Sequence, residues 1–471
     1  MASTTQAFSP SGAFRIWPAQ GHMRLWQGEI VTLLATASPI VLIGILTMAM
    51  SIADMVMLGR FDPDGLATIV VVSDLYSIIF NFSAGFASVV TPQVATAIGA
   101  RVRWRVCTIV RRTLLLVLGL AAAGAVMILC SSSLLQAVGV RQTADGGAYA
   151  ACMAGAYMFM VLFALVRAVL SAMGRPGAAI LAICAALPVK LGANFVFIGG
   201  MWGVPAFGAV GAGLASLLVA VLMGGSLLLY LWFSKSFAEF DAYPDGTFVP
   251  PSTFVIPSSR ALAVSGSLLG LTAVAETGVF LASTIVVGML AANDLIVHAL
   301  AFRALATGYL LIAAVGQAAT LRMAYLGARS AKGLERHALL AVLSFSVALI
   351  VIILLVMVAA ATPLGRLLAS TIEGGAYLAA PTADLLRVAG LTLAALVPAH
   401  MFAALLRARR IVGMPTALML TCYWGLGLGL MLLLCKVGLG AWGTWASLLI
   451  GAVAASIAFA VYFARAEAAA R

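Results

Sequence analysis

Long uninterrupted apolar runs are the feature that most constrains the fold of this chain. The sequence contains twelve of them, each of about 20 residues or more. A helix of that length crosses the hydrocarbon core of a bilayer, whereas the strands of a membrane barrel would be short and alternating. The runs therefore predict an all-α polytopic membrane protein with twelve transmembrane helices. They begin near Val31, Leu66, Thr108, Ala148, Ala178, Phe207, Ala263, Val297, Ala338, Ala380, Pro415 and Trp442.

The amino-acid composition agrees with a membrane protein of the helical type. Hydrophobic residues make up 63% of the chain and charged residues only 9%, whereas a soluble protein carries about 25% charged residues. The segment that ends at Glu29 is polar and mixed, and it has no short apolar core followed by a small-residue cleavage site. We therefore do not expect a signal peptide.

The formal charge of +12 could indicate binding to nucleic acid, but the positions of the basic residues indicate a membrane topology instead. With a cytoplasmic N-terminus, most Arg and Lys residues fall in cytoplasmic segments, which predicts that both termini are cytoplasmic. We expect a location in the cell membrane, in a bacterium the inner membrane, with the lipid bilayer and no nucleic acid as partner. The basic groups are Arg101, Arg103, Arg105, Arg111 and Arg112; Arg322, Arg329, Lys332 and Arg336; and Arg407, Arg409 and Arg410, against Arg60, Arg141, Arg366 and Arg387 on the opposite side.

The cysteines do not form a recognisable metal or redox motif. None belongs to a C-x-x-C pair, and none has a His at ligand spacing. We expect all six to be small buried hydrophobic residues, and we expect no metal site. They are Cys107, Cys130, Cys152, Cys184, Cys422 and Cys435.

The two halves of the chain repeat each other weakly. Gly99-Ala100-Arg101 recurs as Gly327-Ala328-Arg329, and Arg167-Ala168 recurs as Arg407-Ala408, each time followed by a Gly and a Pro. Each segment and its repeat lie roughly 230–240 residues apart in the sequence, half the chain length, which is typical of a duplicated transporter. Because each half has an even number of spans, the two copies are expected to share their topology, with a pseudo-two-fold axis along the membrane normal.

The duplication predicts two six-helix lobes and a linker. The linker is rich in Pro and charged residues, and proline resists helix formation. The predicted segments are a cytoplasmic N-terminal segment at 1–29, an N-lobe with helices 1–6 at 30–233, a cytoplasmic linker at 234–260, a C-lobe with helices 7–12 at 261–464, and a cytoplasmic tail at 465–471.

Polar side chains inside the apolar runs are the first candidates for functional residues. Asp54 lies in the long run from Pro39 to Ala67, and insertion scales put a charge at mid-bilayer at roughly 2.5–3.5 kcal/mol. The alternative is that Asp54 lies near the outer interface and is hydrated, since Gly59 follows it closely. Asp74 and Asn81 lie two helical turns apart in the second run and share a face, so both are candidate cavity residues.

Lys190 in the fifth run needs an acidic partner, and Asp54 is the candidate. Asn194 lies one turn further along the same helix and faces the same way, so it could add hydrogen bonds to the pair. Neither charge would be stable alone, whereas a hydrogen-bonded pair could be. Two interpretations remain open: a static ion pair that only fixes helix register, and a proton-labile pair that lines a cavity. Ser216 is a further polar residue, in the sixth run.

The second half contains one acid in the middle of an apolar run, Glu276. It is either a functional acid or a satisfied internal acid without a role. Arg303 lies about one turn into the eighth run and is a candidate cavity residue. His298 is expected at the outer end of that run, hydrated or satisfied rather than acting as a ligand. Asn293-Asp294 is expected to be solvated in the outer loop.

The chain contains several segments whose combination, order and spacing are specific for one protein family, although no single segment is. They are SIADMVMLGRFDPDGLA, TPQVATAIGA from Thr91, LVRAVLSAMGRPGAA from Leu165, ANFVFIGGMWGVPAFGAVGAGLAS from Ala193, Glu276, and VHALAF followed by LRMAYLGA. Through them the chain resembles the multidrug and toxin extrusion (MATE) antiporters over nearly its full length. The resemblance implies two six-helix lobes arranged in a V, a central cavity, and export driven by H⁺ or Na⁺.

The resemblance also implies roles for residues at matching positions. Asp54 matches the first-helix Asp of the family, a cation-coupling group, and Glu276 matches the seventh-helix acid of the second lobe. Asn194 falls where the fifth helix carries Asn or Asp in the same network. Ser216 falls on a Ser/Thr position of the sixth helix.

Two departures from the family pattern bear on the coupling ion. Lys190 stands where the family usually has Asn, and Leu396 stands near the point of the tenth helix where many members have Asp. An ammonium beside Asp54 would repel Na⁺, and the missing acid removes an oxygen ligand of the kind that such cations prefer. Both departures favour H⁺ over Na⁺, and no cofactor is expected besides the coupling ion.

The expected function is cation-coupled export of small organic compounds or drugs by a monomer that works by alternating access. A flippase or exporter of a lipid-linked or specific metabolite in the same superfamily is the alternative, although such proteins often carry extra helices or a strongly cationic cavity. A membrane enzyme would need a catalytic cluster, and the only long loop, 234–260, contains neither His nor Cys. A channel is not expected, because it would have no need of two duplicated lobes with buried acids.

Overall fold

Helices form nearly all of the described part of the chain. The computed structural model describes residues 22–100, 102, 105–131, 146–233, 256–291, 294–329, 332–370 and 375–470, and these residues contain no β-strand. Long apolar stretches favour this outcome, because a helix satisfies its backbone polar groups internally and needs no partner segment to do so. The predicted all-α fold class is confirmed.

Eleven candidate membrane spans occur among the described residues. The last of them, Gly413–Ala469, has 57 residues, about 85 Å as a straight helix, which is more than twice the ~30 Å that one bilayer core requires. This stretch bends at Gly438, where φ is 93°, and therefore holds two spans. The described helices thus supply the twelve spans that the sequence predicts.

Two compact units make up the chain. One holds Ser38–Gly270, and the other holds Leu271–Arg471 together with residues 22–37 of the described chain. Helix α1 (His22–Phe61) and helix α10 (Ser259–Leu290) therefore contribute to both units. The predicted lobe and tail bounds stay a prediction. Residues 1–21 of the predicted N-terminal segment and residues 234–255 of the predicted linker lie outside the described residues.

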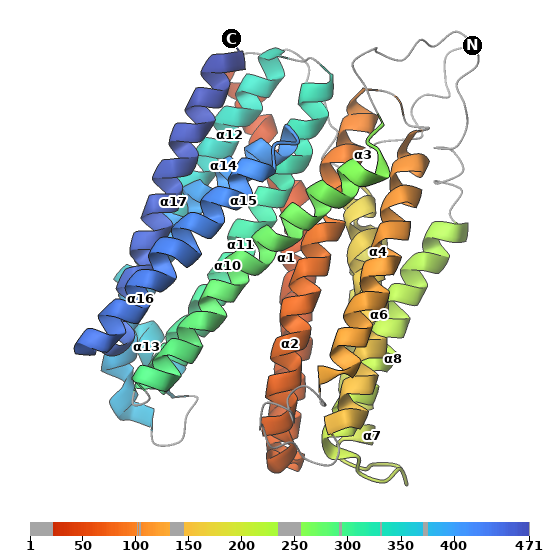
Figure 1. Ribbon diagram of the computed structural model, residues 1–471, viewed down its shortest axis with the longest axis vertical. Helices are drawn as coiled ribbons and strands as arrows, with labels where there is room; N and C mark the ends of the chain where they lie inside the picture. The colour runs from red at the N-terminus through yellow and green to blue at the C-terminus, as the bar shows by residue number, and fades with distance from the viewer. Residues whose placement is uncertain are drawn as a thin grey trace. The chain divides into compact units, whose positions relative to one another are not determined.

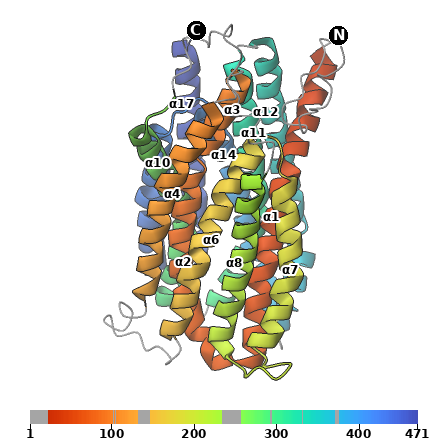
Figure 2. The same ribbon diagram turned by 90° about the vertical axis from the view of Figure 1, so that its right-hand side faces the viewer.

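Helix α6 forms the centre of the first unit. It packs against α2, α3, α4 and α8, and α7 packs on α8; Figure 2 shows α4, α6, α8 and α7 side by side. The helices of this unit, besides parts of α1 and α10, are α2 (Pro63–Ala87), α3 (Val90–Gly99), α4 (Arg105–Leu129), α6 (Gly146–Ala172), α7 (Gly177–Phe197) and α8 (Gly208–Phe233).

Glycines of α8 allow its close packing. A β-carbon at Gly211 would lie 2.3 Å from the Phe197 carbonyl oxygen, and one at Gly224 would lie 2.4 Å from the Phe159 carbonyl oxygen. The backbones of α7 and α6 therefore approach α8 at distances that only glycine permits.

Helix α14 forms the centre of the second unit, where it packs against α11, α12, α13 and α17 (Figure 1). Three segments of this unit are π-helical, a form that is often found at functional sites. The elements are α11 (Leu295–Ala328), α12 (Lys332–Ile353), η3 (Leu354–Ala359), α13 (Ala361–Ala369), η4 (Gly375–Leu378), α14 (Ala379–Ala408), α15 (Gly413–Met419), η5 (Leu420–Leu428), α16 (Gly429–Leu434), η6 (Cys435–Leu439) and α17 (Gly440–Ala470).

Two equivalent aspartates cap the first turn of a helix, one in each unit. The backbone N–H of Ala209 donates to Asp62 Oδ2 at 2.9 Å, and that of Ala441 donates to Asp294 Oδ2 at 3.0 Å, and the sequence separation of the partners is 147 in both cases. Gly208 and Gly440, which precede the donors, both have a φ of 51°. We call each arrangement an aspartate clasp. The repeat of the same contact supports the predicted duplication.

The clasp corrects the expectation that Asp294 is solvated in an outer loop. Its carboxylate instead satisfies a free N–H of the first turn of α17, where the helix dipole also favours negative charge. Asn293, its predicted companion, lies outside the described residues.

The expectation for the six cysteines is wrong for most of them. Only Cys422 and Cys435 are buried, whereas Cys130 and Cys184 are exposed and Cys107 and Cys152 are intermediate. The outward faces of these helices are themselves apolar, and Leu181, for example, is 72% exposed. A small thiol fits such a face as well as it fits an interior, so burial does not follow from its apolar character.

An ion pair that the sequence did not predict joins α1 to α11 within the second unit. Arg322 donates from Nε and Nη2 to the two carboxylate oxygens of Glu29 at 2.8 and 2.6 Å. Glu29 is 0% and Arg322 1% exposed. Both residues flank apolar runs, where the sequence indicates hydrated charges, but in the structure both are buried and paired with each other.

Candidate functional site

The predicted pair of Asp54 and Lys190 is present in the first unit. Helix α7 places Lys190 Nζ 2.9 Å from Asp54 Oδ1 of α1. The Asn194 side chain, one turn further along α7, donates to the same oxygen at 2.7 Å. The Lys190 side chain is only 3% exposed, whereas that of Asp54 is 27% exposed. The ammonium is thus enclosed, and the carboxylate keeps one open side.

The pair belongs to a network of three helices. Lys190 Nζ also donates to Ser216 Oγ of α8 at 2.7 Å, and the Ser216 hydroxyl donates to the Ala212 carbonyl at 2.8 Å. Asn194 Oδ1 is buried without a hydrogen-bond partner among the described residues. The structure therefore brings together four of the predicted site residues, Asp54, Lys190, Asn194 and Ser216, at hydrogen-bond distance.

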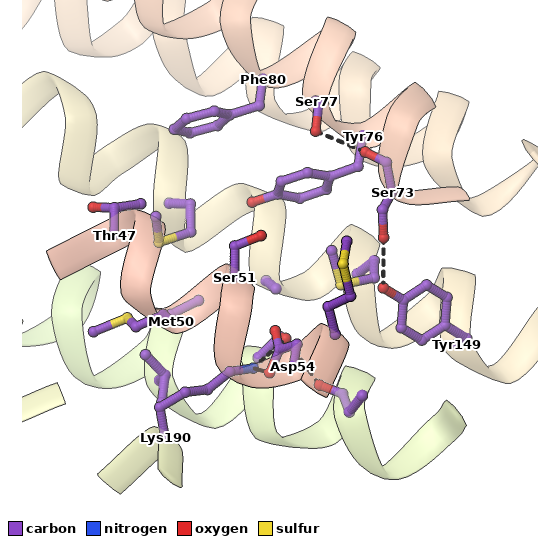
Figure 3. A pocket seen from close by; sticks show the side chains of 18 of the residues that line it. Thr47, Met50, Ser51, Asp54, Ser73, Tyr76, Ser77, Phe80, Tyr149 and Lys190 are labelled. Carbon is purple, nitrogen blue, oxygen red and sulfur yellow. Dashed lines mark hydrogen bonds and ion pairs between the residues drawn. The ribbon is translucent and has the colours of Figure 1, made fainter. Parts of the chain in front are cut away.

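The open side of Asp54 faces a cavity of about 420 Å³ within the first unit. Figure 3 shows Asp54 and Lys190 on one wall, with aromatic side chains from α2 opposite. Three of the lining residues are charged, namely Asp54, Asp74 and Lys190, and most of the others are apolar. Five are methionines, namely Met50, Met55, Met153, Met160 and Met223, and three are aromatic, namely Tyr76, Phe80 and Tyr149.

Asp74 of α2 is the second acid of the cavity wall. Its side chain is exposed and forms no ion pair among the described residues. Two aromatic rings of α2 lie in the same wall, with Tyr76 and Phe80 stacked at 5.9 Å between ring centroids. The structure thus places Asp74 in a cavity, as the sequence predicts. Asn81, the other residue predicted for this face, does not line the cavity.

Glu276 forms a separate cluster in the second unit. Helix α10 places it against Tyr309 of α11 and His400 of α14. The Tyr309 hydroxyl donates to Glu276 Oε2 at 2.6 Å and lies 2.9 Å from His400 Nε2. His400 Nε2 is itself 3.4 Å from Glu276 Oε2. Glu276 is 8% and His400 3% exposed, whereas Tyr309 is partly exposed.

The other residues predicted for this half lie outside the cluster. Arg303 is exposed on α11. His298 is fully buried rather than hydrated, and its Nε2 lies 3.2 Å from the Thr284 hydroxyl. His298 is therefore satisfied in part by a neighbouring helix, because α10 and α11 pack together at this point.

The sequence prediction missed Tyr309 and His400. A tyrosine or histidine in an apolar run is common in packed cores, so neither stands out as a charged residue does. The one signal was a histidine without a visible partner in the middle of an apolar helix. Among the described residues, no three His, Cys, Asp or Glu side chains are grouped so as to hold a metal ion.

The fold and these two polar sites define a class of protein, a polytopic membrane transporter. The match to known families is specific. The MatE family model matches residues 39–196 and 269–433, more than half of the chain, with one segment in each half. The chain belongs to the MatE family. As a member of this family of multi-pass membrane proteins it is a transporter and not an enzyme.

Curated relatives and solved structures agree with this assignment. A probable multidrug resistance protein NorM of Bradyrhizobium diazoefficiens is 27% identical over 426 residues, 90% of each chain. One of Mesorhizobium japonicum is 28% identical over 324 residues, 68% of each chain. A crystal structure described as MATE in complex with MaL6 has a TM-score of 0.81 at 18% identity and covers 96% of this chain and 99% of that one.

Proposed function

We propose that the protein is an H⁺-coupled antiporter that exports small organic compounds by alternating access, and that lipophilic cations are its preferred substrates. The observation that carries the proposal is the Asp54–Lys190 pair in the wall of a 420 Å³ cavity. Both NorM relatives are described as probable multidrug resistance proteins, which supports the export of drug-like compounds.

The position of the Lys190 ammonium supports H⁺ as the coupling ion. It lies 2.9 Å from Asp54 Oδ1, and Asn194 donates to the same oxygen. A sodium ion at Asp54 would therefore stand close to a second positive charge. Two unit charges 4 Å apart repel by about 4 kcal/mol at an effective dielectric constant of 20. A proton avoids this repulsion, because it neutralises the carboxylate instead of adding a cation beside it.

The charges of the cavity lining support exchange of a proton for a cationic substrate. With both acids ionised, Asp54, Asp74 and Lys190 give the lining a net charge of −1. A proton on Asp54 brings this charge to zero. A cation is thus attracted when Asp54 is ionised and released when Asp54 is protonated, so the two ligands compete for the same negative charge. Competition of this kind is what antiport requires.

The remaining lining suits molecules with apolar or aromatic parts. Methionine side chains are flexible and polarisable and adapt to ligands of different shape. Aromatic faces such as those of Tyr76 and Phe80 attract organic cations. We therefore expect a broad range of substrates rather than one specific metabolite.

The membrane orientation belongs to the proposal. The concentration of Arg and Lys in alternate connections supports cytoplasmic termini at a bacterial inner membrane. We expect a monomer, because each compact unit contains its own polar site within one chain.

The test is efflux of ethidium, a fluorescent aromatic cation, from proteoliposomes under H⁺ and Na⁺ gradients imposed separately. We expect efflux with the H⁺ gradient and none above the protein-free background with the Na⁺ gradient. Asp54→Asn should abolish H⁺-driven efflux. The matched control is Asp384→Asn, which removes an exposed acid that pairs with Arg387. Efflux driven by Na⁺ alone, or unchanged H⁺-driven efflux in Asp54→Asn, would refute the proposed function.

A further inference from the structure

The cluster of Glu276, Tyr309 and His400 has more hydrogen-bond acceptors than hydrogens. The Leu396 carbonyl oxygen, which can only accept, lies 3.0 Å from His400 Nδ1, so Nδ1 carries a hydrogen. In a neutral imidazole, Nε2 then has a free lone pair. The single hydrogen of the Tyr309 hydroxyl thus faces two acceptors, Glu276 Oε2 at 2.6 Å and His400 Nε2 at 2.9 Å.

A third acceptor of the cluster is unfilled as well. Glu276 Oε1 is buried and has no hydrogen-bond partner among the described residues. Buried acceptors of native proteins are nearly always satisfied, so a set of them that shares one hydrogen needs an explanation. A further hydrogen on His400 Nε2 would relieve the competition for the Tyr309 hydrogen, because Nε2 would then donate instead of accept, whereas Glu276 Oε1 would stay as it is.

We propose that His400 takes up and releases a proton in the second unit, and that Tyr309 links it to Glu276. In this step H⁺ adds to the lone pair of Nε2, no bond breaks, and the cluster charge changes from −1 to 0. Nε2–H then donates to the Tyr309 oxygen while the Tyr309 hydroxyl donates to Glu276 Oε2. The three side chains, from α10, α11 and α14, thereby form one continuous chain of hydrogen bonds.

Of the charged groups around the cluster, Glu276 favours a proton on His400, whereas the positive charge of Arg407 opposes it. Glu276 is in contact with the imidazole at 3.4 Å, so its carboxylate stabilises an imidazolium directly. Arg407, which also interacts with Glu276, lies two helical turns from His400 on α14. Tyr423 of η5 faces Glu276, and its hydroxyl has no hydrogen-bond partner among the described residues. From α17 the nearby polar group is the Ser456 hydroxyl, which bonds the Ala395 carbonyl and does not titrate.

The inference rests on the proposed H⁺ coupling and adds a second proton site to it. Asp54 and His400 belong to different compact units, and the cavity lies in the unit of Asp54. Protonation of His400 therefore changes the charge of a buried helix contact and not the charge of the cavity lining.

The test is histidine-selective ¹⁵N NMR of the full-length protein in detergent micelles. The chain has four histidines, and single substitutions assign their signals. Between roughly pH 8 and pH 5 we expect the His400 ring to change from one protonated nitrogen to two. At a given pH, Glu276→Gln should lower the doubly protonated fraction of His400 severalfold, because the favourable charge is lost. His298→Asn, which removes a buried histidine that has hydroxyl partners instead, should leave the His400 signal unchanged.

Wild-type protein supplies the decisive measurement, so an unstable variant does not decide the outcome. If the His400 ring keeps one protonated nitrogen throughout this range while His337 of α12 titrates, the inference is wrong. It is equally wrong if Glu276→Gln leaves the His400 titration unchanged, because the proton would then not depend on the cluster. If the H⁺ gradient drives ethidium efflux but the His400 ring keeps one protonated nitrogen, the proposed function stands and only this inference fails. A titrating His400 in a protein driven by Na⁺ would refute the proposed function alone.

Discussion

Lys190 Nζ lies 2.9 Å from Asp54 Oδ1, so helix α7 holds the Lys190 ammonium against the carboxylate of α1. The Lys190 side chain is 3% exposed and also donates to Ser216, which leaves it little freedom to turn away. The carboxylate faces the cavity on its other side. Any ligand or ion that reaches Asp54 therefore meets an acid that is already paired, and proton uptake by Asp54 would break this pair.

The first prediction concerns the strength of the Asp54–Lys190 pair. Lys190→Asn alone leaves an unpaired carboxylate, and Asp54→Asn alone leaves a buried ammonium, so each should destabilise the protein. The double variant should be less damaging than the sum of the singles by about 0.5–3 kcal/mol. Thermal unfolding of the four proteins in detergent measures this coupling. Simple additivity would show that the pair contributes nothing, and Asp384→Asn serves as the surface control.

The residues that were predictable are those whose chemistry conflicts with their surroundings in the sequence. A Lys in an apolar run has to find an acid, and Asn194 at one-turn spacing has to share its face, so three members of the site followed from the pattern. The twelve spans followed in the same way from the lengths of the apolar runs.

The residues that were not predictable depend on packing between distant segments. Tyr309 and His400 are ordinary residues until α11 and α14 bring them to Glu276. Glu29 and Arg322 stand at the ends of apolar runs, where charges are usually hydrated, but the fold buries both and pairs them with each other. No periodicity or spacing encodes such contacts, because each partner is consistent with its own local environment.

The second prediction concerns Asp74 and the charge of the substrate. Asp74→Asn brings the charge of the cavity lining from −1 to zero without touching the Asp54–Lys190 pair. Ethidium should bind roughly tenfold more weakly, a loss of about 1.4 kcal/mol. An uncharged aromatic compound of similar size should bind with little change. Fluorescence titration of the purified protein measures both affinities, and an equal loss for the two ligands would argue against a role for Asp74 in charge selection.

The third prediction concerns the aspartate clasp. Asp62→Ala removes the acceptor for the Ala209 N–H and should destabilise the protein by about 0.5–2 kcal/mol. Gly208→Ala should be worse, because its β-carbon would lie 2.3 Å from Asp62 Oδ2 at a φ of 51°. Gly203→Ala is the matched control, since Gly203 also has a positive φ, of 82°, but an added β-carbon would have no neighbour within 4 Å. If Gly208→Ala and Gly203→Ala lower the melting temperature equally, the loss comes from the positive φ alone and not from the contact with Asp62.

The fourth prediction concerns two adjacent glycines of α8. A β-carbon at Gly224 would lie 2.4 Å from the Phe159 carbonyl oxygen, whereas one at Gly225 would meet nothing within 4 Å. Gly224→Ala should therefore separate α8 from α6 and lower the melting temperature. Gly225→Ala should be neutral or stabilising by up to about 1 kcal/mol, because alanine favours the helix. Similar effects of the two substitutions would show that close packing at Gly224 is not needed.

The last prediction concerns the buried ion pair of Glu29 and Arg322. Both side chains are almost completely buried, and two hydrogen bonds of 2.8 and 2.6 Å join them. Glu29→Gln or Arg322→Met alone leaves one buried charge without its partner, which should destabilise the protein by about 3–5 kcal/mol. The double variant removes both charges and should recover a large part of this loss, because two desolvation penalties disappear with the pair.

A surface ion pair provides the comparison for this measurement. Arg409 and Glu467 pair with 30% of each side chain exposed, and Glu467→Gln should change stability by at most about 1 kcal/mol. Thermal unfolding of both sets in the same detergent gives the difference directly. A Glu29→Gln variant as stable as Glu467→Gln would mean that water reaches the Glu29 pair. Because residues 22–37 belong to the second unit, a large loss would instead show that Glu29 anchors the start of α1 to that unit.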